Sequence, residues 1–262
     1  MKISTEIESV VTRLGDEKGL KALAEAGFDG WDFTLCPIYD SHHPLSGPQY
    51  LSYVRQLRKM GEDLGMVCNQ SHAPFPSDRI DAMKRAIECT AEAGGSICVI
   101  HPLQNRSLAE NTAFYRELLP FAKGCGVKIA TENILIPYTC ATPEQYLAQL
   151  ADVNDPDFVA CLDIGHGEIA GSTLELIQAL GPHLQALHIH DNDKCKDLHQ
   201  LPFTGAIDFA PIMKALKEIG YTGWLTLEAD GFLYNLPDAQ VASSVPQLYA
   251  AAQRLHKLYT EM

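Results

Sequence analysis

The sequence has no cluster of basic residues. Its 262 residues include 20 Lys and Arg against 33 Asp and Glu, a formal net charge of −13 at pH 7. A protein surface that binds duplex nucleic acid normally carries a basic stripe that neutralises phosphates. The missing stripe argues against a nucleic-acid partner, and an acidic balance is ordinary for a metabolic enzyme.

Long apolar runs and paired cysteine motifs are also missing. No apolar run approaches the roughly 18 residues that a membrane span needs. The first residues, MKISTEIESVV, lack the apolar core of a signal peptide. The 8 cysteines are scattered and form no C-x-x-C pair, which indicates reduced thiols rather than a disulfide framework. We therefore expect a cytoplasmic protein with no membrane partner.

Short apolar, β-rich runs alternate with longer helical patterns along the whole chain, which is typical of repeated β-α units. Hydrophobic residues make up 46% of the sequence, enough for a substantial core. Strands are expected at Lys2–Ile7, Gly30–Leu35, Gly65–Ser71, Ser96–Ile100, Val127–Thr131, Phe158–Leu162, Leu184–Ile189 and Gly223–Leu227. Helices are expected before Gly27 and at Asp78–Ala93, Leu108–Lys123, Thr142–Ala151 and Asp238–Tyr259.

Eight strands, each followed by a helix, predict a closed parallel (β/α)₈ barrel of the TIM type. The rival fold is an open, doubly wound sheet, which would usually show a glycine-rich phosphate loop after its first strand. No such loop is present, and no linker or low-complexity segment divides the chain. We therefore expect one α/β domain that spans residues 1–262.

Residues able to bind a metal follow six consecutive strands of the expected barrel. The active site of such a barrel lies at the carboxyl ends of its strands. Carboxylates and imidazoles at these positions are costly to bury unless they are paired or bound to a cation. The residues, from the third strand to the eighth, are His72, His101, Glu132, Asp163 with His166, His188 with His190 and Asp191, and Glu228.

Such a mixed nitrogen and oxygen set suits zinc, manganese, cobalt or iron, with magnesium as a further candidate, better than a soft thiolate site does. Cys161 shares the strand parity of Asp163 but lies two residues earlier, so we interpret it as barrel filling.

The strand ends resemble the xylose-isomerase-like TIM-barrel superfamily of sugar isomerases and epimerases, which also contains endonuclease IV. The similar motifs are SHAP at 71–74, TEN at 131–133, LDIGH at 162–166, HIHDND at 188–193, DLH at 197–199 and TLE at 226–228. In the sugar branch, the resemblance implies one metal held by Glu132, Asp163, His188 and Glu228, with His190 as the alternative to His188. In the endonuclease branch it implies additional zinc ligands, here His72, His101, His166, Asp197 and His199.

The resemblance implies a divalent-metal-dependent isomerase or epimerase that acts on a small sugar or sugar phosphate. Glu132 and Glu228 would be the catalytic acid and base beside a metal-bound carbonyl. Two alternatives stay open: an endonuclease IV-like phosphoesterase with several zinc ions, and a dehydratase or lyase on the same barrel. One metal ion is favoured over several, no other cofactor is expected, and a homo-oligomer is an open alternative.

Other residues support narrower hypotheses. Asp32 is expected either to meet a substrate hydroxyl or to be a buried structural carboxylate. Lys194, Lys196 and Gly205 could recognise a phosphate or a carboxylate, and solvated lysines are the alternative. An apolar wall against a sugar face is expected from Tyr39, Phe75 and Phe203, and Asp208 is expected to cap the helix that follows it.

Overall fold

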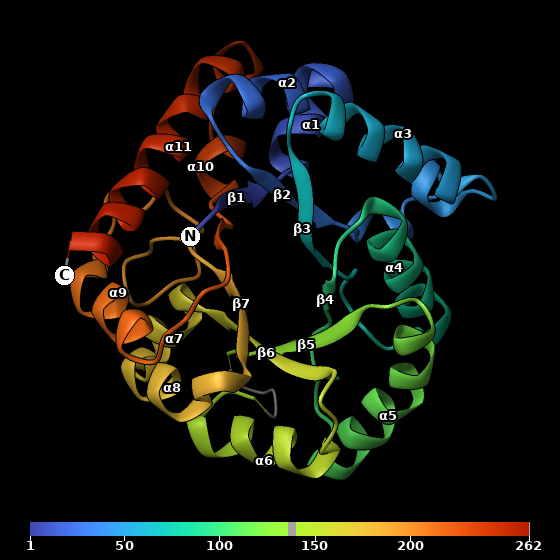
Figure 1. Cartoon of the computed structure of the whole chain (residues 1–262), viewed down its shortest axis with the longest axis vertical. Coiled ribbons are helices and arrows are strands. Elements are labelled where there is room, and N and C mark those ends of the chain that lie inside the picture. The colour runs from blue at the N-terminus through green and yellow to red at the C-terminus, as the bar shows by residue number, and fades with distance from the viewer. Residues whose placement is uncertain (136–139, 262) are drawn as a thin grey trace.

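The computed structural model describes residues 1–135 and 140–261 and forms a ring of eight parallel strands surrounded by helices (Figure 1). The strand order is β7-β6-β5-β4-β3-β2-β1-β8. The ring closes where Ile189 bridges to Leu227. There the Ile189 amide donates to the Thr226 carbonyl at 3.0 Å, and the Glu228 amide donates to the Ile189 carbonyl at 3.0 Å. The expected (β/α)₈ barrel is therefore confirmed.

All eight predicted strands are present, and they differ from the prediction mainly at their ends. The third strand begins two residues later than expected because Gly65, at φ +79°, belongs to the turn before it. The strands are β1 Ile3–Glu6, β2 Gly30–Thr34, β3 Val67–His72, β4 Ile97–Val99, β5 Lys128–Glu132, β6 Phe158–Asp163, β7 Leu184–His188 and β8 Leu225–Leu227.

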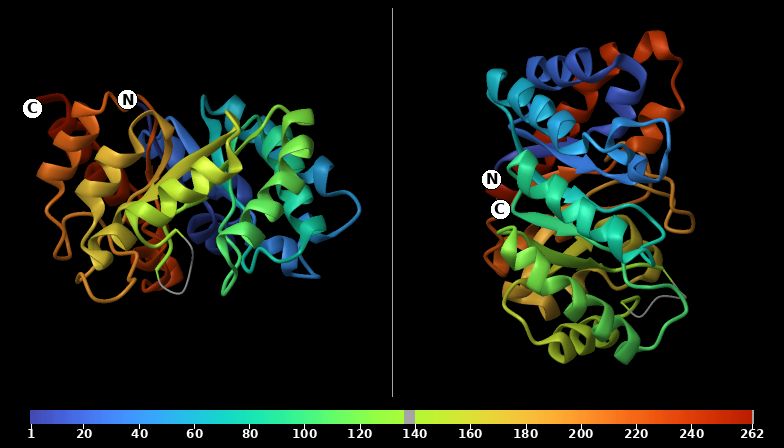
Figure 2. Two further views of the ribbon diagram at one scale, coloured as in Figure 1. Left: turned by 90° about the horizontal axis from the view of Figure 1, so that it is seen from below. Right: turned by 90° about the vertical axis from the view of Figure 1, so that its right-hand side faces the viewer.

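The helices cover the outside of the ring (Figure 2). They are α1 Glu8–Leu14, α2 Asp16–Ala26, α3 Tyr50–Asp63, α4 Ile80–Ala93, α5 Leu108–Gly124, α6 Pro143–Val153, α7 Ile164–Ala170, α8 Thr173–Leu180, α9 Phe209–Glu218, α10 Asp230–Tyr234 and α11 Asp238–Glu261, with short 3₁₀ turns η1 Cys36–Tyr39, η2 Pro44–Ser46 and η3 Gly181–His183. Within the part of the chain that is described, no helix combines the length and apolar character that a membrane crossing requires.

Local signals placed several helix ends correctly. Gly27 adopts the left-handed conformation at φ 112° after α2, as predicted, and the Asp208 side chain accepts a hydrogen bond from the Ala210 amide at the start of α9. The sequence did not reveal that Gly15, at φ 80°, separates two helices after β1. It also did not reveal the break at Gly171 between α7 and α8.

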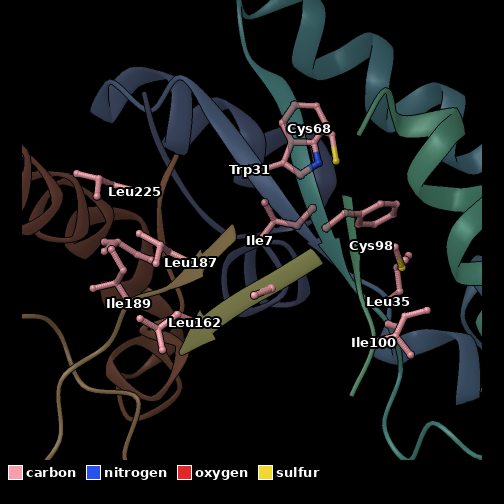
Figure 3. Close-up of a cluster of buried hydrophobic side chains, with 14 of the residues drawn as sticks. Ile7, Trp31, Leu35, Cys68, Cys98, Ile100, Leu162, Leu187, Ile189 and Leu225 are labelled. Atoms are coloured by element: carbon pink, nitrogen blue, oxygen red, sulfur yellow. The ribbon is translucent and has the colours of Figure 1, made fainter. Parts of the chain in front are cut away.

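Outward-facing strand residues build the main core between barrel and helices. Leu162, Leu187, Ile189 and Leu225 are all completely buried, and Figure 3 shows them together on one side of the ring. Each such side chain stabilises the fold by about 1.5–3 kcal/mol relative to an exposed one. The alternation of strand residues then turns the intervening positions inward.

The interior of the barrel has an apolar half and a polar half. Beneath β4 to β7 it is filled by Val99, Ala130, Val159, Cys161 and Ala186, so Cys161 fills the barrel as expected. Beneath β8, β1, β2 and β3 it holds hydrogen-bonded polar side chains, namely Thr226, Ser4, Asp32, Asn69 and Gln70.

The close contact between α3 and β2 gives a test of the fold. A Cβ on Gly61 would lie 2.1 Å from two carbons of the Trp31 indole, which is 1% exposed. We expect Gly61→Ala to lower the free energy of unfolding by about 1–3 kcal/mol through overpacking. Chemical denaturation measures this.

Gly124→Ala, at the end of α5, is the matched control because nothing lies within 4 Å of its Cβ position. It should be neutral or stabilise by about 0.5–1 kcal/mol. Equal stabilities for the two variants would show that α3 does not pack this closely.

Candidate metal centre and active site

Four side chains from the last four strands converge at the mouth of the barrel. Glu132 ends β5, Asp163 ends β6, His188 ends β7 and Glu228 follows β8. One potential ligand atom from each lies within 4.8 Å of the others. His188 Nδ1 is 3.0 Å from Glu132 Oε1 and 3.3 Å from Glu228 Oε2. The structure therefore brings together the quartet proposed from the sequence, with His188 rather than His190 in it.

The donor atoms of this quartet suit a divalent cation. Glu132, Asp163 and His188 are at most 1% exposed and Glu228 is 19% exposed. Asp163 Oδ2 is buried and has no hydrogen-bond partner among the described residues. Buried carboxylates without full pairing are costly, and a bound cation removes that cost. Three carboxylates and one imidazole are ligands that zinc, manganese and related ions accept.

The charges of this quartet shift its pKa values. Burial opposes ionisation of Glu132, but the charges of His188 and His101 hold its pKa well below the usual value. Burial likewise opposes ionisation of Asp163, but His166 and His190 lower its pKa to about 2. Burial raises the pKa of Glu228, and its pKa rises further because Glu132 is nearby. Two negative carboxylates therefore lie beside one that holds its proton more readily.

A first flanking cluster consists of His72, His101 and Glu132. His101 Nε2 is 2.9 Å from both Glu132 Oε2 and His72 Nε2. Burial and the charge of His72 lower the pKa of His101. Burial also opposes protonation of His72, but hydrogen bonding to Glu132 raises the pKa of His72. Glu132 therefore belongs to this cluster and to the central quartet, with one oxygen directed to each.

A second flanking cluster consists of His166, His190, Asp197 and His199. Asp197 Oδ2 is 3.1 Å from His166 Nε2, and Asp197 Oδ1 is 3.2 Å from His199 Nε2. His190 stacks on His199, with ring centroids 4.0 Å apart. Despite burial, hydrogen bonds from both partners hold the pKa of Asp197 well below the usual value. His190 Nε2 also lies 3.2 Å from Asp163 Oδ1, so this cluster adjoins the quartet at Asp163.

Asp191 is not a ligand candidate, which corrects the expectation from the strand ends. Its carboxylate accepts hydrogen bonds from the backbone amides of Asn192, Gly205 and Ile207 at 2.8, 2.9 and 3.1 Å. These bonds fold the β7–α9 loop back on itself. Gly205 serves this packing rather than phosphate recognition, since a Cβ there would lie 2.4 Å from the Asp191 carboxylate.

Two further loop residues of the sequence hypotheses have partners in the structure. Lys194 Nζ lies 2.8 Å from Glu168 Oε2. Phe203 packs against Phe209 and beneath the Arg254 guanidinium. Of the expected apolar wall, Phe75 lies beside the imidazole of His101, at 5.6 Å between ring centroids. The Tyr39 hydroxyl supports the same loop by donating to the Pro76 carbonyl at 2.7 Å.

The sequence analysis missed Glu6, at the carboxyl end of β1. It is 5% exposed and accepts hydrogen bonds from the amide and hydroxyl of Ser9. Burial, together with the charge of Asp230, raises the pKa of Glu6 to about 8. Its parity with Ser4 could have placed it inside the barrel, but this strand gave the weakest sequence signal. Every strand thus supplies a titratable side chain within it or just after it.

The structure is thus an α/β barrel with groups of potential metal ligands at the carboxyl ends of its strands. A family model described as xylose isomerase-like TIM barrel matches residues 20–251. The chain belongs to this family.

Several relatives carry the names of enzymes, and others are uncharacterised. An uncharacterised protein of Methanocaldococcus jannaschii is 28% identical over 256 residues, which cover 88% of this chain and 83% of the relative. Fructoselysine 3-epimerase of Escherichia coli O157:H7 is 30% identical over 134 residues, 50% of this chain and 47% of that enzyme. Inosose dehydratase of Bacillus velezensis is 24% identical over 241 residues, 83% of this chain and 72% of that enzyme.

A solved structure gives a similar result. The structure of a D-tagatose 3-epimerase-like protein superposes with a TM-score of 0.74 and 25% sequence identity. The alignment covers 98% of this chain and 99% of that protein. The fold is therefore matched along nearly the whole chain.

The role of Asp191 can be tested through the loop that carries Asp197 and His199. Asp191→Ala leaves three backbone amides without their acceptor, each costing about 1–3 kcal/mol when buried. We expect limited proteolysis to cut within residues 192–208 of this variant but not of the parent protein. Asp193→Ala is the control because Asp193 is exposed and accepts from the nearby Cys195 and Lys196 amides. A protease-resistant Asp191→Ala variant would contradict the role.

Proposed function

We propose that this protein is a divalent-metal-dependent isomerase or epimerase of a small sugar or sugar phosphate, with one cation held by Glu132, Asp163, His188 and Glu228. The convergence of Glu132 and Glu228 on one position from non-adjacent strands carries the proposal. One ligand atom of each glutamate lies within 4.8 Å of the other and of those of Asp163 and His188, so both carboxylates could contact a single cation. Membership of the family supports the proposal, as do the epimerase names of several relatives.

The chemistry follows from this pair of carboxylates. A bound cation would supply Lewis-acid polarisation of a substrate carbonyl, which acidifies the neighbouring C–H. One glutamate then removes that proton, and the other returns a proton from the opposite face, which inverts the carbon. If a single glutamate returns the proton to the adjacent carbon, the outcome is isomerisation. Phe75 beside His101 offers an apolar face for the carbon side of the sugar.

Replacing either glutamate with glutamine tests the acid–base roles. Glu132→Gln and Glu228→Gln each keep the side-chain size but remove the proton-transfer group. We expect each to reduce turnover by about 10²–10⁴-fold. The measurements are chromatography of ketose products and incorporation of solvent deuterium next to the carbonyl.

The control is Glu117→Gln, on the exposed face of α5, which should be unaffected. If Glu132→Gln and Glu228→Gln both retain full exchange and full turnover, the two glutamates are not the acid and base.

The two flanking clusters favour a second candidate, a phosphoesterase with several metal ions. His72 and His101 could hold one additional ion with Glu132, and His166, Asp197 and His199 could hold another. In such a centre the ions would activate water and stabilise the leaving oxygen. The net charge of −13 disfavours a polyanionic substrate.

Metal content separates these candidates. We expect one tightly bound divalent ion per chain by elemental analysis, and loss of epimerisation after chelation with recovery on adding the ion. About three zinc ions per chain, together with hydrolysis of a phosphodiester, would instead establish the phosphoesterase.

A dehydratase is the third candidate, and the inosose dehydratase relatives support it. Proton removal next to a carbonyl is common to both reactions, so the glutamates cannot distinguish them. Mass spectrometry does, because dehydration lowers the mass of the product by one water and epimerisation leaves it unchanged.

A further inference from the structure

A buried carboxylate lies directly behind the imidazole of the quartet. Asp32, in the middle of β2, is 1% exposed. Its Oδ2 is 3.1 Å from His188 Nε2, while the other ring nitrogen, Nδ1, faces Glu132 and Glu228 at 3.0 and 3.3 Å. The ring therefore has one nitrogen toward the cation position and the other toward Asp32.

This orientation decides which nitrogen can bind a cation. A metal-bound imidazole is neutral, with its remaining proton on the nitrogen away from the metal. A carboxylate that accepts from that N–H fixes both the tautomer and the ring angle, and makes the metal-facing nitrogen more basic. Asp32 Oδ2 is placed to accept from His188 Nε2, which leaves the Nδ1 lone pair directed at Glu132 and Glu228.

Asp32 is itself held in place from the polar half of the barrel interior. The Gln70 side-chain amide donates to Asp32 Oδ2 at 2.9 Å. The Thr226 hydroxyl donates to Gln70 Oε1 at 3.4 Å. Ser4 Oγ donates in turn to Thr226 Oγ1 at 2.9 Å. A chain of side chains from β1, β8 and β3 thus ends at the carboxylate of β2 and restricts its rotation.

Among the described residues, the Asp32 carboxylate makes its side-chain hydrogen bonds through Oδ2 alone, with the Gln70 amide and with His188. Asp32 Oδ1 is buried and has no hydrogen-bond partner in the described part of the chain. A buried carboxylate half-satisfied by hydrogen bonds is costly to keep, and an apolar side chain would cost less if packing alone were needed.

We propose that Asp32 is a positioning residue that presents His188 Nδ1 to the cation. This inference rests on the proposed metal centre. It goes beyond that centre by assigning the coordinating nitrogen and by giving the polar half of the barrel interior a role in metal affinity.

The experiment measures cation binding rather than catalysis. Mn²⁺ is titrated into metal-free parent protein, Asp32→Asn, Asp32→Leu and the control Ser4→Ala, and Co²⁺ absorption spectra report the ligand geometry. Asp32→Leu removes the acceptor and should weaken Mn²⁺ binding roughly 100-fold, whereas Asp32→Asn keeps an acceptor without charge and should lose roughly tenfold. Ser4→Ala removes only the far end of the polar chain and should bind as the parent does. Thermal unfolding of each metal-free protein is recorded alongside.

The outcomes separate the inference from the proposed function. If the parent protein binds neither Mn²⁺ nor Co²⁺, the metal centre is wrong, and the role of Asp32 is wrong with it. If the parent binds and both Asp32 variants match its affinity and Co²⁺ spectrum, only the positioning role is overturned. If the Asp32 variants lose no more Mn²⁺ affinity than Ser4→Ala does, Asp32 only supports the fold and the positioning role is overturned. If Asp32→Leu fails to fold, the near-isosteric Asp32→Asn is used instead, and parent-like Mn²⁺ affinity with a parent-like Co²⁺ spectrum overturns the positioning role.

Discussion

The carboxylate of Glu132 is the group on which the arrangement at the barrel mouth depends. One of its oxygens lies 3.0 Å from His188 Nδ1, and the other lies 2.9 Å from His101 Nε2. Closing eight parallel strands into a ring puts all their carboxyl ends on one rim, so titratable side chains that follow the strands must share a small, poorly hydrated space. A negative charge at the centre of this space is stable only because cationic or hydrogen-bond-donating groups surround it.

The barrel interior supports this rim unevenly. Beneath β4 to β7 small apolar side chains such as Ala130 and Ala186 fill the ring and leave its charged layer above them. Beneath the other four strands the interior is polar, and its hydrogen bonds converge on Asp32 and through it on His188. The apolar half fills the barrel below the site, whereas the polar half fixes the orientation of the His188 imidazole. One side of the ring therefore supplies packing and the other supplies hydrogen bonds to the site.

Period-two alternation was sufficient to predict much of this structure. Glu132 and Asp163 end apolar strands, so their inward direction followed from the residues before them. The same reasoning placed Cys161 one layer deeper. This prediction was weakest at β1. Both interior positions of that strand, Ser4 and Glu6, are polar because they belong to the polar half of the barrel, so the strand lacks an apolar inward face that the sequence could show. The same reasoning also misjudged Asp191, because a carboxylate that ties a loop together has the same local sequence pattern as one that binds a metal.

The sequence by itself determined the order of strands and helices, the barrel class and the residues on the rim, because strand periodicity and helix-ending glycines are local properties. Only the tertiary structure decided how those residues divide into clusters. His188 ends β7 and His190 follows it with the same parity, so only their distances to Glu132 and Asp197 distinguish the two imidazoles. The partnership of Asp32 with His188 likewise joins residues 156 positions apart, and such a contact is fixed by closure of the ring rather than by any neighbouring residue.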